Sequence, residues 1–417
     1  MSDSASPAGL TTADGRSLKS ALAAAQARAK WRAFLLVAPL LAFIVITFIV
    51  PIGQMLHRSF YHDGLSANAP ALHAWFAANP EGTAPDEAAY AALAQDFKAM
   101  KANKTAGEAG TRVNYTLPET RSLFTSTARS ADKLAPPYKE AFLALDEKWG
   151  DPAVWVALRS SASAYTADFY LTGLDMERGP DGTLQRVEEN TRIYVWMYVK
   201  TFLLSGLITL ICLLLAFPVA HLLAVLPLSK ANLLMIFVLL PFWTSLLVRT
   251  TSWMVVLQGQ GVVNDALVAL GIIGDDGRLA MMYNQAGTII VMTHVLLPFM
   301  ILPLYSVMKT IPPSYARAAR SLGATSWTTF RRVYLPQTLP GIGAGALLVF
   351  ILAVGYYITP ALVGGADGQL FSNFIQFHMS KSNWSMAAAL SAMLLVGVLI
   401  LYWLYDRLIG IDKLKLG

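Results

Sequence analysis

The residues best suited to recognise another molecule lie in one short basic stretch between two apolar segments. From Ser314 to Gly341 the chain carries four arginines and no acid. Small and aromatic residues recur between the arginines at the spacing of helices. Guanidinium groups beside a small-residue face favour close, charge-assisted contact with another protein rather than bond-making chemistry. The stretch is therefore predicted to be a docking element.

Local signals divide this stretch into two helices. Pro313 suits the first position of a helix, and Gly323 suits the left-handed residue that ends one. Thr325 or Ser326 can cap a second helix, which we expect to end near Pro336. The sequence therefore predicts a compact helix–glycine–helix in the segment 309–340, here called the basic loop.

Residues for catalysis or metal binding are not clustered anywhere in the sequence. Cys212 is the single cysteine and lies in an apolar segment, where a small packed hydrophobe is favoured over a reactive thiol. The Lys and Arg residues behind the formal charge of +6 are scattered at segment ends, which argues against nucleic-acid binding. No phosphate-binding loop of the G-x-x-x-x-G-K-[ST] type is present. We expect no catalytic residue, no metal site and no cofactor.

The composition predicts an all-α integral membrane protein. Hydrophobic residues make up 55% and charged residues 14% of the chain, against roughly 25% charged in soluble domains. A bilayer core needs about 20 apolar residues for each helix. Six stretches qualify as transmembrane helices: Ala33–Gly53, Thr201–Ala224, Asn232–Leu257, Ala286–Met308, Ile342–Val363 and Met386–Leu408.

Charge distribution predicts how these helices cross the membrane. Arg28, Lys30 and Arg32 place the N-terminal tail, 1–32, in the cytoplasm, with the first helix kept as an anchor. Alternation then puts 54–200 outside, and both the basic loop and the tail 409–417 inside. The segment from His57 to Tyr198 has 14 Lys and Arg against 18 Asp and Glu, as an outer location favours.

The segment 54–200, here called the insertion, is long enough to form a small domain. Its interpretation stays open between a solvated cap that packs on the membrane helices and a docking surface for an external partner. The predicted elements are helices at Pro85–Lys101 (acidic start at Asp86), Pro137–Trp149 and Pro152–Tyr170 (cap at Asp151), a flexible loop at Lys101–Gly110, and a turn at Arg178–Gly182 before an extended Thr183–Val187.

The basic loop resembles a family signature. Arg317-Ala318-Ala319, three residues, Gly323, nine residues, Val333, one residue and Leu335-Pro336 match the spacing of the E-A-A-x3-G-x9-I-x-L-P motif of permease subunits of binding-protein-dependent ABC importers. Further segments resemble the polyamine (spermidine/putrescine) branch of that family: Pro241–Leu257, Leu296–Ala324, Pro360–Gly365, and Pro39, Phe43, Pro51 and Ser59-Phe60 of the first helix. The resemblance does not extend to the segment 63–175.

This resemblance implies a fold, partners and a role. It implies the six-helix permease (MetI-like) type, with a five-helix core at 201–408, in a bacterial inner membrane. It implies cytoplasmic ATPase subunits, a second permease subunit and an extracytoplasmic binding protein that delivers a small solute, with ATP hydrolysis carried by the separate ATPase. The motif residues Arg317, Ala318, Ala319, Gly323, Val333, Leu335 and Pro336 would couple this chain to that ATPase. Arg317 replaces the glutamate of the family and reverses its charge, so its contact must differ or position 317 faces solvent.

The solute pathway is less defined. The four helices between 201 and 363 contain no Asp or Glu that could bind a polyamine. Aromatic faces could guide a cation, although interfacial aromatic belts need no ligand. The candidates are Trp243, Trp253, His294 and the mid-helix pair Tyr356-Tyr357. For His294 and His221, a hydrogen bond to a neighbouring helix is favoured over a place in the pore. Arg249 is interpreted as a side chain that reaches toward the membrane interface.

Three alternatives remain at this point. An ABC permease for a different small solute keeps the class and changes only the cargo. A membrane sensor or assembly protein would also have a large outer domain, but we expect tails too short for an effector domain. A secondary transporter would show inverted repeats and ionisable residues within its helices; neither is detected.

Overall fold

The computed structural model describes residues 18–178 and 183–409, and the chain divides into two compact units, Met1–Arg58 and Ser59–Gly417. The first unit is helical through α1 (Leu18–Ile44), a π-turn (Val45–Ile49) and the start of α2 (Val50–Phe60). A span of Ala25–Phe60 is apolar enough to cross a membrane. The helix therefore starts earlier than the predicted Ala33, because the alanine-rich segment before it favours helix. Residues 1–17 of the predicted tail lie outside the described residues, as do 410–417.

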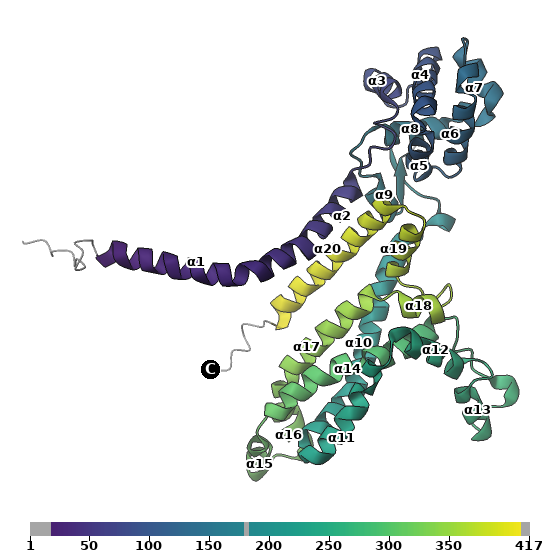
Figure 1. Ribbon diagram of the computed structural model, residues 1–417. Helices are drawn as coiled ribbons and strands as arrows, with labels where there is room; N and C mark the ends of the chain where they lie inside the picture. Colours follow the sequence, from purple (N-terminus) through teal and green to yellow (C-terminus); the bar gives the residue numbers. More distant parts are fainter. Residues whose placement is uncertain (1–17, 179–182, 410–417) are drawn as a thin grey trace, which may run out of the picture. The chain divides into compact units, whose positions relative to one another are not determined.

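The second unit carries the remaining spans (Figure 1). Counting both units, the described residues contain five helices that are long and apolar enough to cross a membrane. The number is six if the one bent pair of helices counts as a span. This agrees with the predicted fold class. The bounds are α10 (Tyr194–Val225), α11 (Leu228–Leu239), α12 (Leu246–Leu257), α13 (Val262–Ala269), α14 (Gln285–Thr310), α15 (Pro313–Ser321), α16 (Ser326–Thr329), α17 (Leu335–Gly355), α18 (Ile358–Val363), α19 (Phe371–Ser380) and α20 (Trp384–Ile409).

The prediction of a continuous third helix over Asn232–Leu257 is wrong. α11 passes into a 3-10 turn at Leu240–Trp243, and the path of the chain bends by 99° before α12 continues. Pro241 lies in the 3-10 turn, and the side chain of Ser245 accepts a hydrogen bond from the backbone N–H of Val248, which starts a new helix.

The predicted fifth span, Ile342–Val363, has wrong bounds at both ends. The helix does not stop near Pro336: a π-turn at Phe330–Tyr334 joins α16 to α17, and Ser326–Gly355 forms one 30-residue span. The wider π-turn lets the helix continue past a proline that lacks an N–H donor. At its other end the helix stops at Gly355, so Tyr356-Tyr357 lies at a break and not near mid-helix.

The insertion is mainly helical, and several predicted bounds need correction. Asp86 and Asp151 cap helices, as expected. The predicted loop Lys101–Gly110 is largely helical, and the predicted helices 137–149 and 152–170 are each interrupted. Its elements are α3 (Pro70–Ala78), α4 (Glu87–Asn103), α5 (Ala106–Asn114), α6 (Thr120–Arg129), α7 (Tyr138–Leu145), a 3-10 turn (Glu147–Gly150), α8 (Pro152–Ala162), α9 (Asp168–Gly173), and β1 (Met176–Arg178) paired antiparallel with β2 (Leu184–Arg186). Of the predicted turn, residues 179–182 lie outside the described residues.

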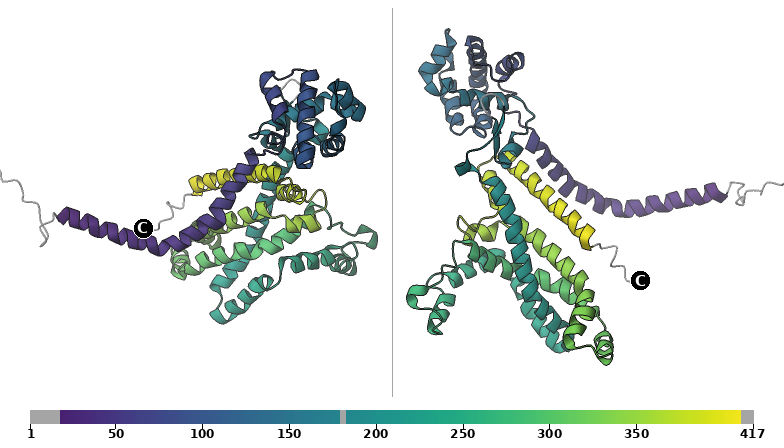
Figure 2. Two further views of the ribbon diagram at one scale, coloured as in Figure 1. Left: turned by 45° about the horizontal axis from the view of Figure 1, so that its top comes forward. Right: turned by 180° about the vertical axis from the view of Figure 1, so that it is seen from behind.

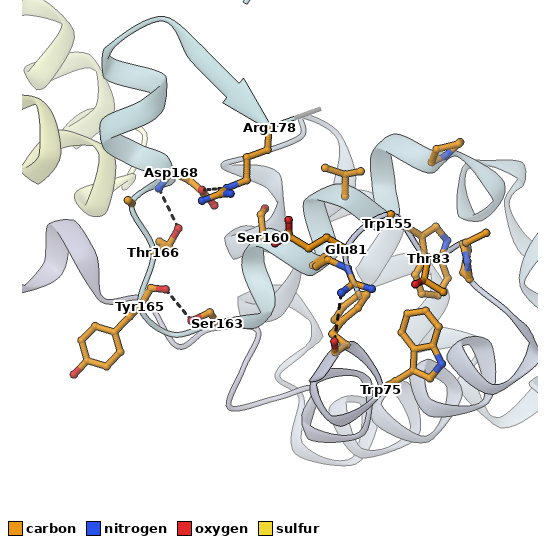
Figure 3. Close-up of a pocket in the computed structure, with 18 of the residues that line it drawn as sticks. Trp75, Glu81, Thr83, Trp155, Ser160, Ser163, Tyr165, Thr166, Asp168 and Arg178 are labelled. Atoms are coloured by element: carbon orange, nitrogen blue, oxygen red, sulfur yellow. Dashed lines mark hydrogen bonds and ion pairs between the residues drawn. The ribbon is translucent and has the colours of Figure 1, made fainter. Parts of the chain in front are cut away.

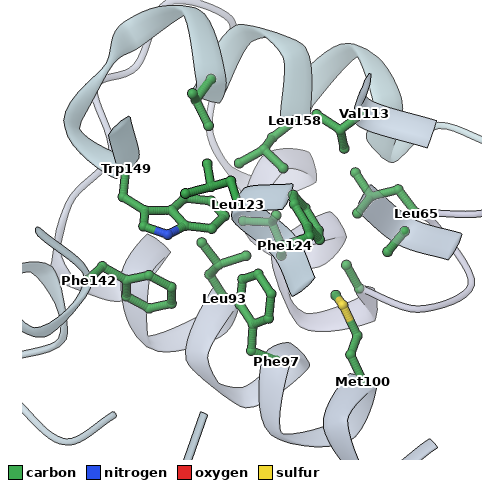
Figure 4. Packing of buried hydrophobic residues seen from close by; sticks show 14 of the residues in the cluster. Leu65, Leu93, Phe97, Met100, Val113, Leu123, Phe124, Phe142, Trp149 and Leu158 are labelled. Atoms are coloured by element: carbon green, nitrogen blue, oxygen red, sulfur yellow. The ribbon is translucent and has the colours of Figure 1, made fainter. Parts of the chain in front are cut away.

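A hydrophobic core of its own holds α3 to α8 together (Figure 4). Trp149 is fully buried, and its ring lies 5.3–5.8 Å from the rings of Phe97, Phe124 and Phe142. Its indole N–H donates to Thr127 at 3.0 Å, which satisfies the one polar group of the side chain. The insertion thus has the buried aromatic centre that a separate domain needs.

The membrane helices form a second core. α10, α14 and α17 pack along one another, as both views in Figure 2 show. A third, smaller cluster joins the insertion to the last span, where Phe169 of α9 packs with Leu390 of α20. The hydroxyl of Tyr115 donates to the carbonyl of Ser382 at 3.0 Å across the same contact. The insertion therefore contacts the membrane part of the second unit, which is compatible with both interpretations of its role.

Candidate functional site

The basic loop forms the first short helix that the sequence predicted and begins the second one at the predicted cap, although that second helix continues into α17. Pro313 occupies the first turn of α15, and Gly323 adopts φ = 86° directly after it. The N–H of Gly323 donates to the carbonyl of Arg320 at 2.9 Å, which closes the end of α15. The side chain of Thr325 accepts the N–H of Thr328 at 3.2 Å and starts α16. The turn between the two helices is thus set by a glycine and a threonine cap.

One side of the basic loop is anchored and the other is free among the described residues. Phe330 packs edge-on against Phe217 of α10 at 5.9 Å, and the hydroxyl of Tyr334 lies 2.8 Å from Nδ1 of His221. By contrast, α15 buries none of its residues. Leu322, at its end, is 88% exposed. Tyr315 and Trp327 of the same loop are exposed as well, so several large apolar side chains of this loop are accessible to a partner.

The motif residues divide between these two sides. Arg317, Ala318, Gly323 and Pro336 are exposed, whereas Ala319, Val333 and Leu335 are half-buried. The carbonyl of Arg317 accepts a bond from Ser321, but the described structure shows no acid paired with its guanidinium. The reversed charge at position 317 is therefore available to a partner.

The broken fifth span forms a second candidate site. Where α17 ends, the carbonyl oxygens of Tyr356 and Tyr357 accept hydrogen bonds from Ser372 and from the amide of Asn373, the latter at 2.8 Å. Asn373 also accepts the N–H of Leu370 at 2.9 Å. Side chains at the start of α19 thus satisfy the backbone that the break leaves open. Non-helical backbone is tolerated in a membrane protein where it is buried in protein or lines a cavity.

A polar cluster from the bent third span and α14 lies near this break. The indole N–H of Trp253 donates to Nδ1 of His294 at 3.0 Å, so the predicted hydrogen bond of His294 to a neighbouring helix is confirmed; His221 has one to Tyr334. Arg249 is close enough to His294 and Tyr356 to interact with both electrostatically. Its Nη2 donates to the carbonyl of Thr244 at 3.2 Å, and its buried Nε has no hydrogen-bond partner among the described residues.

The five predicted pathway residues are therefore only partly brought together. The structure pairs Trp253 with His294 and places Tyr356 near them through Arg249. Trp243 lies before the bend and is 76% exposed, and the side chain of Tyr357 is also exposed. Sequence reasoning missed Ser372 and Asn373. The signal that could have found them is a Ser-Asn pair in the first turn of a helix, where such side chains hydrogen-bond to the backbone.

Comparison with known proteins identifies a family over these same elements. The sequence profile of the family described as "binding-protein-dependent transport system inner membrane component" matches residues 193–409. That range begins just before α10 and includes the basic loop and the broken fifth span, and of the insertion it covers only 193–200.

Curated relatives match over a similar length. The spermidine/putrescine transport system permease protein PotB of Salmonella typhimurium is 35% identical over 222 residues, 52% of this chain and 77% of the relative. PotB of Haemophilus influenzae is 37% identical over 227 residues, 53% and 78% of the two chains. The inner membrane ABC transporter permease protein YdcU of Escherichia coli is 31% identical over 227 residues, 52% and 72%.

Among solved structures, the chain is similar to one of a bacterial ABC transporter involved in the import of the acidic polysaccharide alginate. The sequences are 18% identical, the match covers 69% of this chain and 99% of that chain, and the TM-score is 0.47.

Proposed function

The chain belongs to the family of binding-protein-dependent transport system inner membrane components, and we propose that it imports a polyamine with energy from a separate ATPase. Members of this family are multi-pass permeases of the inner membrane and not enzymes. Membership therefore argues against the alternative of a membrane sensor or assembly protein. The family match across 193–409 carries the proposal, because it includes both the basic loop and the broken span.

The ATPase contact is proposed for the exposed side of the basic loop. α15 offers Arg317, Ala318 and the exposed Leu322, while Phe330 and Tyr334 hold the other side against α10. A small-residue face lets a partner approach closely, and Arg317 needs an acidic or carbonyl partner there. Movement of the ATPase would reach α10 and α17 through these aromatic contacts.

The proposed orientation places the basic loop and both tails in the cytoplasm and the insertion outside. The charge distribution supports it. The test starts from Cys212→Ser and adds Ser122→Cys in the insertion or Ser326→Cys in α16, both at exposed positions. An impermeant maleimide should label Ser122→Cys in intact cells and label Ser326→Cys only after the membrane is opened. The reverse pattern would refute the orientation.

The polyamine cargo is proposed from the relatives named spermidine/putrescine permease at 35–37% identity. In this chain, the aromatic rings of Trp253 and Tyr356 supply faces that attract an ammonium group. The spans between 201 and 363 supply no acid, and Arg249 adds a positive charge beside those rings. We therefore propose that the second permease contributes the carboxylates that offset Arg249 and hold the cargo.

Reconstituted transport tests cargo and energy source separately. Proteoliposomes would hold this chain with its second permease and ATPase, and the binding protein with labelled spermidine would be added outside. We expect uptake that requires ATP and stops when the ATPase is omitted. Uptake without ATP would refute the importer; ATP turnover stimulated by the loaded binding protein but no spermidine uptake would refute only the polyamine.

A further inference from the structure

A cavity of about 400 Å³ lies in the insertion, along one face of α8. The loop between α3 and α4 forms one wall, and the segment leading into α9 forms one end (Figure 3). Its volume falls within the range of sites that hold small molecules, about 300–1,000 Å³. The cavity is part of the insertion, outside the region that matches the permease family.

The two ends of the cavity differ in chemistry. Trp75, Trp155 and Pro85 form an apolar end. Ser163, Thr166 and the ion pair of Asp168 with Arg178 line the other end, as Figure 3 shows. The hydroxyl of Ser163 already donates to a backbone carbonyl, at 2.8 Å. Thr166 accepts the N–H of Asp168 at 3.1 Å. The polar end is thus held in place by the chain itself.

Arg159 brings a positive charge to the lining of the cavity. Its guanidinium lies over the ring of Phe76 at 4.7 Å and over Trp75 at 5.8 Å. Nη1 donates to the carbonyls of Phe76 at 3.3 Å and Asn79 at 2.8 Å. Nη2 is buried and has no hydrogen-bond partner among the described residues. A buried donor without a partner is costly, so an acceptor from a bound molecule would stabilise this group.

Asp168 brings the complementary group. Its Oδ1 accepts from Nε of Arg178 at 3.1 Å, whereas Oδ2 is buried and has no partner in the described part of the chain. One unpartnered donor and one unpartnered acceptor therefore belong to residues that line the same cavity. Glu81 also lines the cavity and is close enough to Arg159 to interact with it electrostatically, so the lining has two carboxylates and two guanidinium groups and no net charge.

From this arrangement we propose that the insertion binds an amino-acid-type zwitterion with an apolar side chain. The ligand's carboxylate pairs with Arg159, and its ammonium pairs with Asp168 and Glu81. Its side chain lies at the apolar end beside Trp75 and Trp155. A small shift of the two side chains exposes Nη2 and Oδ2 to the ligand and satisfies both.

The same charges exclude the polyamine cargo from this cavity. A polyamine carries several positive charges and no negative one, so it could pair with Asp168 and Glu81 but would bring no anion for Arg159 and would add positive charge beside Arg159 and Arg178. Arg159 also lies over Phe76 and Trp75, so an ammonium group at these two rings would meet a positive charge already present. The cavity is therefore a site for a second molecule and goes beyond the proposed transport function.

Titration calorimetry on the full chain in detergent tests this with three matched compounds and spermidine. L-phenylalanine has both charges, 3-phenylpropionate lacks the ammonium, and 2-phenylethylamine lacks the carboxylate. We expect phenylalanine to bind at least tenfold tighter than either truncated compound and tighter than spermidine. No phenylalanine binding, equal binding of the three compounds, or tighter binding of spermidine would each overturn the proposal. This comparison uses the unmodified chain, so it needs no variant to fold.

Two variants assign the charges. Arg159→Gln should weaken phenylalanine and phenylpropionate at least tenfold and leave phenylethylamine unchanged. Asp168→Asn should weaken phenylalanine and phenylethylamine and leave phenylpropionate unchanged. Arg129→Gln changes an exposed arginine of the insertion outside the cavity and is the matched control. An equal loss for Arg129→Gln, or a loss for all three compounds in both cavity variants, would contradict the assigned contacts.

Discussion

Replacing Gly323 should uncouple transport without affecting insertion into the membrane. Gly323 has φ = 86°, and a Cβ added there would meet no atom within 4 Å. The cost of a side chain is therefore backbone strain alone, about 1–2 kcal/mol for a non-glycine residue in the left-handed region. This shifts the population of the native turn by about 5- to 30-fold. Asparagine tolerates that region, and a β-branched residue does not.

The assay is ATP-dependent uptake by proteoliposomes that contain equal amounts of each variant. We expect uptake to fall in the order glycine, Asn, Ala, Val at position 323, with a loss of up to about 5- to 30-fold for Gly323→Ala. Gly271 is the matched control, because it has φ = 70°, equally open surroundings and a place outside the basic loop. Gly271→Ala should retain uptake. Normal uptake by Gly323→Val, or equal losses at both positions, would refute the reasoning.

Three further predictions concern stability of the full chain, followed by thermal unfolding. Burial lowers the pKa of His62, so protonation favours the unfolded chain, and stability should fall as pH drops below about 6.5; His62→Gln should flatten this dependence. Asp175 accepts three backbone N–H groups at the start of α10 at 2.9–3.1 Å, so Asp175→Ala should cost about 1–2 kcal/mol and lower the unfolding temperature. A Cβ on Gly365 would lie 2.3 Å from the carbonyl oxygen of Tyr283, so Gly365→Ala should cost about 1–3 kcal/mol, whereas Gly206→Ala, in open space, should not destabilise. An unchanged pH dependence in His62→Gln, or no difference from the original chain in the other two, would contradict these contacts.

Local signals in the sequence were reliable where a single residue sets the backbone conformation, as at a helix cap or a left-handed turn. Pro313, Gly323 and Thr325 each occupy the predicted position in the basic loop, and Asp86 and Asp151 cap their helices. A cap or a left-handed turn depends on atoms within about four residues. Such features need no knowledge of the fold.

The errors occur where contacts with residues distant in the sequence determine whether a segment is helical and where a helix ends. The segment 101–110 reads as a loop, but α5 is helical there and Gly110 packs directly on Phe124 of α6. The break after Gly355 is supported by Ser372 and Asn373, sixteen residues away. Pro336 does not end its helix, because a membrane span keeps its backbone bonds by local adjustment around a proline.

By itself, the sequence determined the class of the protein, its apolar stretches and the motif of the basic loop, because these depend on composition and on short spacings; the breaks and ends of the spans it did not determine. Only the tertiary structure decided which side of that loop is free, since Phe217 and His221 cover the other side from another helix. It also decided that Arg159 and Asp168 share one cavity. Their unpartnered groups line a common cavity only after α8 and the start of α9 have packed around it. Contacts of that kind do not produce a periodic pattern in the sequence.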